Sequence, residues 1–181
     1  MIVSGVQIGA PREAGWEDPI GMLSDCHRRI ERFLNVLERV IEREPLQTLD
    51  AEARSALQGA LQYFRVSGVR HTEDEELSLF PRLRAAPEGL QELQSIPTLQ
   101  NDHRLAERLH AATELLGSKW MSGPLLTEEA EQLRQTVKAH RSLYTQHIEM
   151  EDRLLFPAAR RLLSPSEQSA MGAEFRQRRE E

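Results

Sequence analysis

Two stretches of this sequence carry the same set of side chains that can bind metals or protons. HTEDEELSLFP begins at His71 and HIEMEDRLLFP begins at His147, and both read His, then Glu four residues later, then Leu-Phe-Pro. The stretches are 76 residues apart, and the same interval separates His27 from His103. The chain therefore reads as two copies of a helix pair. The side chains that hold this pattern are His27, His71, Glu75, His103, His147 and Glu151.

These six side chains are expected to meet in one layer of the protein interior. Residues i and i+4 stack on one face of an α-helix, so Glu75 and Glu151 point the same way as the histidines that precede them. Burying two carboxylates without compensation is costly, and four neutral imidazoles leave lone pairs with no donor. A bound metal resolves both problems. The alternative is a hydrogen-bonded polar layer that only fills the core.

The number and type of ligands favour a pair of iron ions. Four imidazoles and two carboxylates are too many for one tetrahedral zinc. They suit two octahedral ions, each with two histidines and both sharing the carboxylates, and mixed nitrogen and oxygen ligation favours iron over manganese. The Glu-x-x-His motif of ferritin-type bundles is absent, because Gly68 and Tyr144 stand three residues before His71 and His147.

Amphipathic helices are predicted to position this layer. Apolar residues recur in steps of three and four along four segments, at about 19–44, 51–80, 97–121 and 127–158. Asp18, Asp50 and Thr127 are predicted helix caps, Pro45 is predicted to end the first helix, and Phe80-Pro81 is expected to bend or end the second. The fold class that follows is all-α, an antiparallel up-down four-helix bundle.

The chain is expected to form one domain with two short appendages. Residues 1–17 are broken by Gly, Pro and Ser and are predicted to be an N-terminal arm, which Trp16 could anchor to the body. A capping box that begins at Ser164 opens a short C-terminal helix. The domain then spans 18–181, and its two pseudo-repeats cover about 18–85 and 95–163.

Composition and charge exclude several classes of partner. The 181 residues carry a net charge of −6, which argues against nucleic acid or an anionic membrane. No run approaches the roughly 18 apolar residues of a membrane span, and the N-terminus is a poor signal peptide. The single cysteine, Cys26, rules out an internal disulfide and fits a reducing cytoplasm.

Further polar residues are predicted near the layer. Glu107 is a candidate seventh ligand, and its repeat mate Glu31 a candidate for the surrounding shell; both could equally stay in solvent. His110 and His140 should face each other about 10 Å from the layer, as a packed pair, a proton relay or a secondary metal site. Tyr144 could reach a metal-bound oxygen or simply pack.

One acidic run is read as surface. In the run 73–76, only Glu75 is expected to face inward, and the other three carboxylates are expected to be solvated.

The motif set resembles the hemerythrin-like family, the HHE cation-binding domains, over roughly residues 18–180. The resemblance implies a four-helix bundle that holds an oxo- or hydroxo-bridged di-iron centre. By position, Glu75 and Glu151 would bridge, and the histidines would divide into two pairs. Oxygen-carrying hemerythrins have a further histidine where this chain has Glu107, which puts simple reversible oxygen carriage in doubt.

The function that this reading predicts is a cytoplasmic non-haem di-iron protein that binds dioxygen or a related small oxidant such as nitric oxide or peroxide. Its role would be oxygen or redox sensing, scavenging or iron handling rather than that of a dedicated metabolic enzyme. One alternative is a role in nitric oxide stress or iron–sulfur repair; the proteins of that kind in the family carry an extra cysteine-bearing N-terminal domain, and residues 1–17 contain no Cys. Two others are a metal-dependent interaction module, with its surface on the segment from Ser164, and a structural bundle without metal. The pattern leaves the oligomeric state open.

Overall fold

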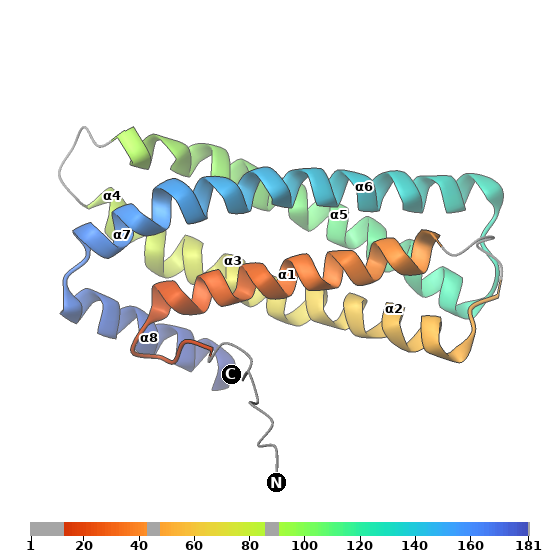
Figure 1. The fold of residues 1–181 in the computed structure, drawn as a ribbon, viewed down its shortest axis with the longest axis horizontal. Coiled ribbons are helices and arrows are strands. Elements are labelled where there is room, and N and C mark those ends of the chain that lie inside the picture. Colours follow the sequence, from red (N-terminus) through yellow and green to blue (C-terminus); the bar gives the residue numbers. More distant parts are fainter. Residues whose placement is uncertain (1–12, 43–47, 86–90, 181) are drawn as a thin grey trace, which may run out of the picture.

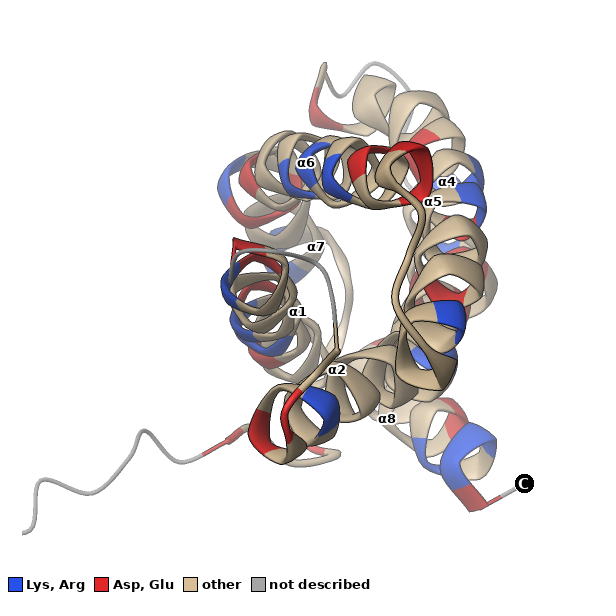
Figure 2. Ribbon diagram, turned by 90° about the vertical axis from the view of Figure 1, so that its right-hand side faces the viewer, with Lys and Arg blue, Asp and Glu red and all other residues tan. Residues whose placement is uncertain are grey.

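The computed structural model describes residues 13–42, 48–85 and 91–180. It confirms an all-α bundle, and these ranges contain no β-strand. Four long helical segments run alternately up and down, and Figure 1 shows them side by side. Seen end-on, the four segments surround a common axis and α8 lies outside them (Figure 2). The segments are α1 (Pro19–Glu42), a second built from α2 to α4, α5 (Ile96–Ser122), and a fourth built from α6 and α7.

The second and fourth segments are interrupted helices with matching interruptions. The second comprises α2 (Ala51–Tyr63), η1 (Phe64–Gly68), α3 (Val69–Asp74), η2 (Glu75–Leu79) and α4 (Phe80–Arg84). The fourth comprises α6 (Thr127–Met150), η4 (Glu151–Leu155) and α7 (Phe156–Leu162). The turns η1, η2 and η4 are π-helical, and η2 and η4 stand 76 residues apart. A 3₁₀ turn, η3 (Gln91–Ser95), leads into α5, and α8 (Pro165–Glu180) closes the chain.

Phe80-Pro81 was expected to bend or end the second helix; it does not end it, because the segment continues into α4, and a π turn explains how. The backbone N–H of Phe80 bonds to the carbonyl of Glu75, five residues back. This wider turn makes room before Pro81, which cannot donate a hydrogen bond and would clash with a regular preceding turn. The fourth segment repeats the device, since Phe156 bonds to the carbonyl of Glu151 ahead of Pro157. Both π turns begin at a glutamate of the predicted layer.

Most predicted helix starts are confirmed. The Asp50 carboxylate accepts from the N–H of Ala53 at 2.7 Å, and Asp18 accepts from Gly21 at 2.9 Å. The capping box at Ser164 forms with Glu167, which accepts from the Ser164 N–H at 2.8 Å.

One predicted helix start is wrong, and one predicted helix end lies outside the described residues. The predicted cap at Thr127 was wrong by one residue: Leu126 is the cap, and Glu129 accepts from its N–H at 3.1 Å. The first helix ends at Glu42, and the predicted stop at Pro45 lies outside the described residues.

Two apolar clusters lie on either side of the predicted layer. The first cluster includes Ile30, Leu34, Phe64 and Tyr144, and the second includes Leu23, Leu79, Phe80, Leu99 and Leu155. Along α1 and α5, His27 and His103 fall between residues of the two clusters. Burial of these clusters drives the helices together, and the polar layer lies buried between them.

The final helix, although outside the four segments, contributes buried side chains to the second apolar cluster. Its 16 residues make it longer than the short helix predicted, and Met171 and Phe175 are fully buried in the second apolar cluster. Asp74 is also fully buried, and it accepts from Arg178 Nε at 2.8 Å and Arg179 Nη2 at 2.6 Å. Asp74 is therefore not the solvated carboxylate that was expected, because α8 covers it.

The end of the predicted N-terminal arm contacts α1 and α8. The N–H of Ala14 donates to Asp25 at 2.6 Å, and the guanidinium of Arg179 lies 5.6 Å from the Trp16 ring. Gly172 permits this approach, since a Cβ there would lie 1.9 Å from the carbonyl oxygen of Trp16. Residues 1–12 of the arm lie outside the described residues.

Candidate metal centre

The six side chains of the repeated pattern share one buried layer. Each histidine comes from a different helical segment, and none of the six is more than 8% exposed. Their ligand atoms form two groups in which all atoms lie within 4.8 Å of one another. One group is His27, His71, Glu75 and Glu151; the other is Glu75, His103, His147 and Glu151. Two histidine pairs therefore share two carboxylates.

Each carboxylate connects histidines of the two halves. Glu151 Oε2 lies 3.0 Å from His27 Nε2 and 3.2 Å from His147 Nε2. Glu75 Oε1 lies 3.4 Å from His71 Nε2, while its Oε2 lies 3.2 Å from His103 Nε2. The four Nε2 atoms thus converge on the two glutamates. Such an array of inward-pointing nitrogen and oxygen lone pairs is typical of a site for two cations.

Three further carboxylates orient the outer nitrogens of the histidines. Asp152 accepts from His27 Nδ1–H at 3.0 Å, and Glu76 accepts from His103 Nδ1–H at 2.8 Å. Asp102 Oδ2 lies 3.5 Å from His147 Nδ1. A carboxylate on Nδ1 holds the ring so that Nε2 presents its lone pair to a metal.

These outer carboxylates were missed in the sequence, and Glu76 was expected to be solvated. The repeat interval could have identified two of them, because Glu76 and Asp152 are also 76 residues apart. The repeat mate of Asp102 is Cys26, and no described residue bonds to His71 Nδ1. His71 is therefore the one histidine of the layer with no carboxylate beside Nδ1 among the described residues, whereas His147 has Asp102 at 3.5 Å without a hydrogen bond.

The layer leaves many of its buried polar atoms without a hydrogen bond. Among the described residues, nine buried side-chain atoms have no partner, and eight of them belong to this layer. Both ring nitrogens of His71 and both oxygens of Glu75 are among the eight. Unpaired buried polar atoms are rare in proteins and costly. Six of the eight are histidine Nε2 atoms or carboxylate oxygens, which fit coordination of metal ions, and the other two are the outer Nδ1 atoms of His71 and His147.

In the metal-free protein, protonated histidines supply the positive charge that balances the buried carboxylates. Burial opposes protonation of His147, but the Glu151 carboxylate overcomes it and raises the pKa of His147 to about 10. Asp152 and Glu151 likewise raise the pKa of His27 to about 9 against burial. Burial and the nearby Glu151 charge raise the pKa of Glu75 to about 7. Metal binding must displace these protons, so it is expected to weaken as the pH falls.

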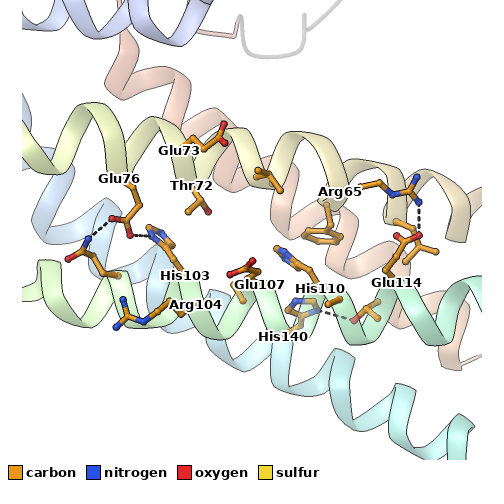
Figure 3. A pocket seen from close by; sticks show the side chains of 18 residues that line it. Arg65, Thr72, Glu73, Glu76, His103, Arg104, Glu107, His110, Glu114 and His140 are labelled. Carbon is orange, nitrogen blue, oxygen red and sulfur yellow. Dashed lines mark hydrogen bonds and ion pairs between the residues drawn. The ribbon is translucent and has the colours of Figure 1, made fainter. Parts of the chain in front are cut away.

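The structure places Glu107 and Glu31 outside both groups. Both side chains are exposed, and neither contributes an atom to the two clusters of ligand atoms. Glu107 lies on α5 one turn beyond His103 and lines a groove beside the layer (Figure 3). Its role as a seventh ligand therefore finds no support in the geometry.

Tyr144, His110 and His140 form a connected set beside the layer, with Tyr144 about one helical turn from it and the two histidines about two turns from it. The His110 and His140 rings are 4.7 Å apart, and Tyr144 Oη lies 3.1 Å from His110 Nε2. The Tyr144 hydroxyl is therefore bonded to His110 and not to a backbone carbonyl. Burial lowers the pKa of His110 to about 4; burial together with His110 lowers that of His140 to about 3.

The His140→Phe variant of the metal-free protein is expected to resist acid better than the wild type. A depressed folded-state pKa gives stability that is present above pH 6.5, the unfolded value, and is lost as the pH falls towards 3. Between pH 7 and 4 the wild type should lose about 3 kcal/mol of unfolding free energy relative to the variant. Urea unfolding at several pH values measures this difference, and parallel curves would contradict it.

Comparison with known proteins agrees with this geometry. Residues 18–162 match the family described as hemerythrin HHE cation binding domain. A protein of Haemophilus influenzae (strain ATCC 51907 / DSM 11121 / KW20 / Rd), named only as an uncharacterized protein, is 29% identical over 178 residues, which cover 97% of this chain and 98% of that protein. Within the described ranges, no helix has the length and apolar character to cross a membrane. With a family match over most of its length and the histidines and glutamates gathered in one buried layer, this chain belongs to the hemerythrin HHE cation-binding domain family.

Proposed function

We propose that the protein holds two iron ions in the buried layer and reacts there with dioxygen or a related small oxidant such as nitric oxide or peroxide. The observation that carries the proposal is the sharing of Glu75 and Glu151 by two histidine pairs. His27 and His71 would bind one ion, and His103 and His147 the other. The two buried carboxylates would offset part of the positive charge of the ions.

Iron is proposed over other metals from the ligand chemistry. Four imidazoles favour a transition metal over magnesium or calcium, and the two carboxylates disfavour copper(I) and a thiolate-type zinc site. A pair of ferrous ions supplies two electrons to an oxidant when it is bound. The residues of the chain would orient the ions and keep bulk water out of the layer, and the outer carboxylates would keep the proton of the neighbouring histidine on Nδ1.

The experiment that tests the redox role is admission of oxygen to the ferrous-loaded protein. The protein is loaded without oxygen, freed of excess metal and then mixed with air, and its visible spectrum is followed. New charge-transfer bands that require the loaded protein support the proposal. Their reversal when oxygen is removed would indicate carriage, and their persistence would indicate scavenging or sensing. An unchanged spectrum in a protein that retains its iron would contradict the redox role.

The Asp152→Asn variant is expected to weaken iron binding about tenfold. An amide on His27 Nδ1 holds the ring less firmly than the carboxylate does and no longer raises the basicity of Nε2. Competition with a chelator of known affinity measures the change. Glu131→Gln is the matched control, because Glu131 is exposed on the same segment and makes contact only with its own helix among the described residues. Equal affinities in both variants would rule out the role of Asp152.

A further inference from the structure

A groove of about 540 Å³ opens beside the layer, between the second segment and α5. Figure 3 shows its lining side chains. Leu61, Phe64, Val69 and Ala106 give it apolar walls, and one end reaches His103 and Glu76. Arg104, Glu107 and Ala111 are exposed, so the groove is open to solvent on the α5 side. Its volume lies in the range of roughly 300–1,000 Å³ that is typical of small-molecule sites.

The groove results from small residues that stand in one half of the repeat only. Gly68 and Ala106 line it, and their mates 76 residues away are Tyr144 and Ile30. Tyr144 is 4% exposed and Ile30 is fully buried, and both pack in the first apolar cluster. The large mates therefore fill space that Gly68 and Ala106 leave open. A Cβ on Gly68 would meet only ordinary contacts at 3.7 Å, so close helix packing does not account for the glycine.

Aromatic rings line the deepest part of the groove. The Phe64 ring lies 4.9 Å from the His110 ring and 5.8 Å from the His140 ring. Both histidines are held neutral by burial, which lowers the pKa of each below the physiological range. His140 is fully buried and Phe64 is 4% exposed, so a planar ligand in the groove would contact mainly the half-buried His110 ring and the exposed part of Phe64.

The polar groups of the groove favour a hydrogen-bond donor without negative charge. Arg65 is neutralised by Glu114 at 2.6 Å. Glu76 is bonded to His103 at 2.8 Å, whereas Glu73 and Glu107 make no hydrogen bond or ion pair with any described residue. Figure 3 shows the Glu107 carboxylate between His103 and His110. The groove thus presents four carboxylates against two guanidinium groups, which disfavours an anionic ligand.

We propose that this groove binds a neutral planar aromatic alcohol, with its ring against Phe64 and His110 and its hydroxyl donating to Glu107. The stacking surface would hold the ring, and transfer of the ring from water would supply most of the affinity. The acidic opening would select the uncharged alcohol over an aromatic acid of the same shape. The proposal does not depend on iron, because Phe64, His110 and Glu107 lie outside both groups of ligand atoms.

The test uses the complete chain after metal removal, with 2-naphthol as a fluorescent probe and 2-naphthoate as the anionic comparison. The expected result is saturable binding of 2-naphthol, at least about tenfold tighter than binding of 2-naphthoate. Ala111→Trp places a large ring over the groove from an exposed helical position and should abolish binding. Ala173→Trp is the matched control, because Ala173 is exposed on α8 and does not line the groove.

A second variant keeps the test decisive if Ala111→Trp disturbs folding. Glu107→Gln retains the shape of the side chain but removes its charge, and it should narrow the preference for 2-naphthol over 2-naphthoate about tenfold. No saturable binding to the wild type would overturn the proposal. Binding that survives a folded Ala111→Trp variant, or a preference unchanged by Glu107→Gln, would also overturn it.

Discussion

Glu151→Gln is expected to reduce iron loading from about two ions per chain to fewer than one, whereas His71→Ala is expected to leave about one. The difference follows from the sharing of ligands. Glu151 belongs to both groups of ligand atoms, so its loss weakens both ions, while His71 belongs to one group only. The amide of glutamine keeps the volume of the side chain but removes the negative charge that offsets the cations.

Elemental analysis of the loaded and desalted variants measures this difference. Glu149→Gln is the matched control, since Glu149 is exposed on the same segment and pairs with Arg153 at 2.7 Å. It should bind as much iron as the wild type. Equal losses in Glu151→Gln and His71→Ala would mean that the carboxylate is not shared. Full loading of Glu151→Gln would remove Glu151 from the ligand set.

The central layer was the part of the molecule that the sequence could predict best. A repeat interval compares positions directly, so His27 and His103 could be matched without any knowledge of packing. Helical periodicity then placed Glu75 and Glu151 on the inward faces. The bundle itself followed from the apolar steps of three and four, because burial of those faces leaves few arrangements for four helices.

Other features depend on contacts between segments that periodicity does not describe. Asp74 looked like one carboxylate in an acidic surface run, and only the docking of α8 buries it against Arg178 and Arg179. Asp102 lies on α5 and contacts His147 on α6, and the spacing of residues along a single helix cannot predict a contact between two helices. The second segment continues past Pro81 because of a π turn, in which a backbone N–H bonds to the carbonyl five residues back. No particular residue type marks such a turn in the sequence.

Iron binding is expected to raise the midpoint of thermal unfolding by roughly 10 °C. The metal-free layer holds six histidine Nε2 and carboxylate oxygen atoms without a hydrogen-bond partner, and coordination would satisfy them only in the folded chain. Free metal at about 1,000 times its dissociation constant adds about 4 kcal/mol to the free energy of unfolding. For a domain of this size, each kcal/mol moves the midpoint by about 2–4 °C.

Scanning calorimetry of the metal-free and the ferrous-loaded protein, both without oxygen, measures this shift. The increase should disappear when a chelator is added and should be absent from the Glu151→Gln variant. A midpoint that does not respond to either metal or chelator would mean that the six side chains form a polar layer of the core. The bundle would then be a structural domain, and the proposed redox function would have no centre.

The number of metal ions bound per chain tests the central claim most directly. The complete chain is loaded with ferrous iron without oxygen, freed of excess metal and weighed by native mass spectrometry, with elemental analysis as an independent count. Two groups that share two carboxylates are expected to hold about two irons per chain. A chain that binds one ion or none under these conditions would contradict the paired site.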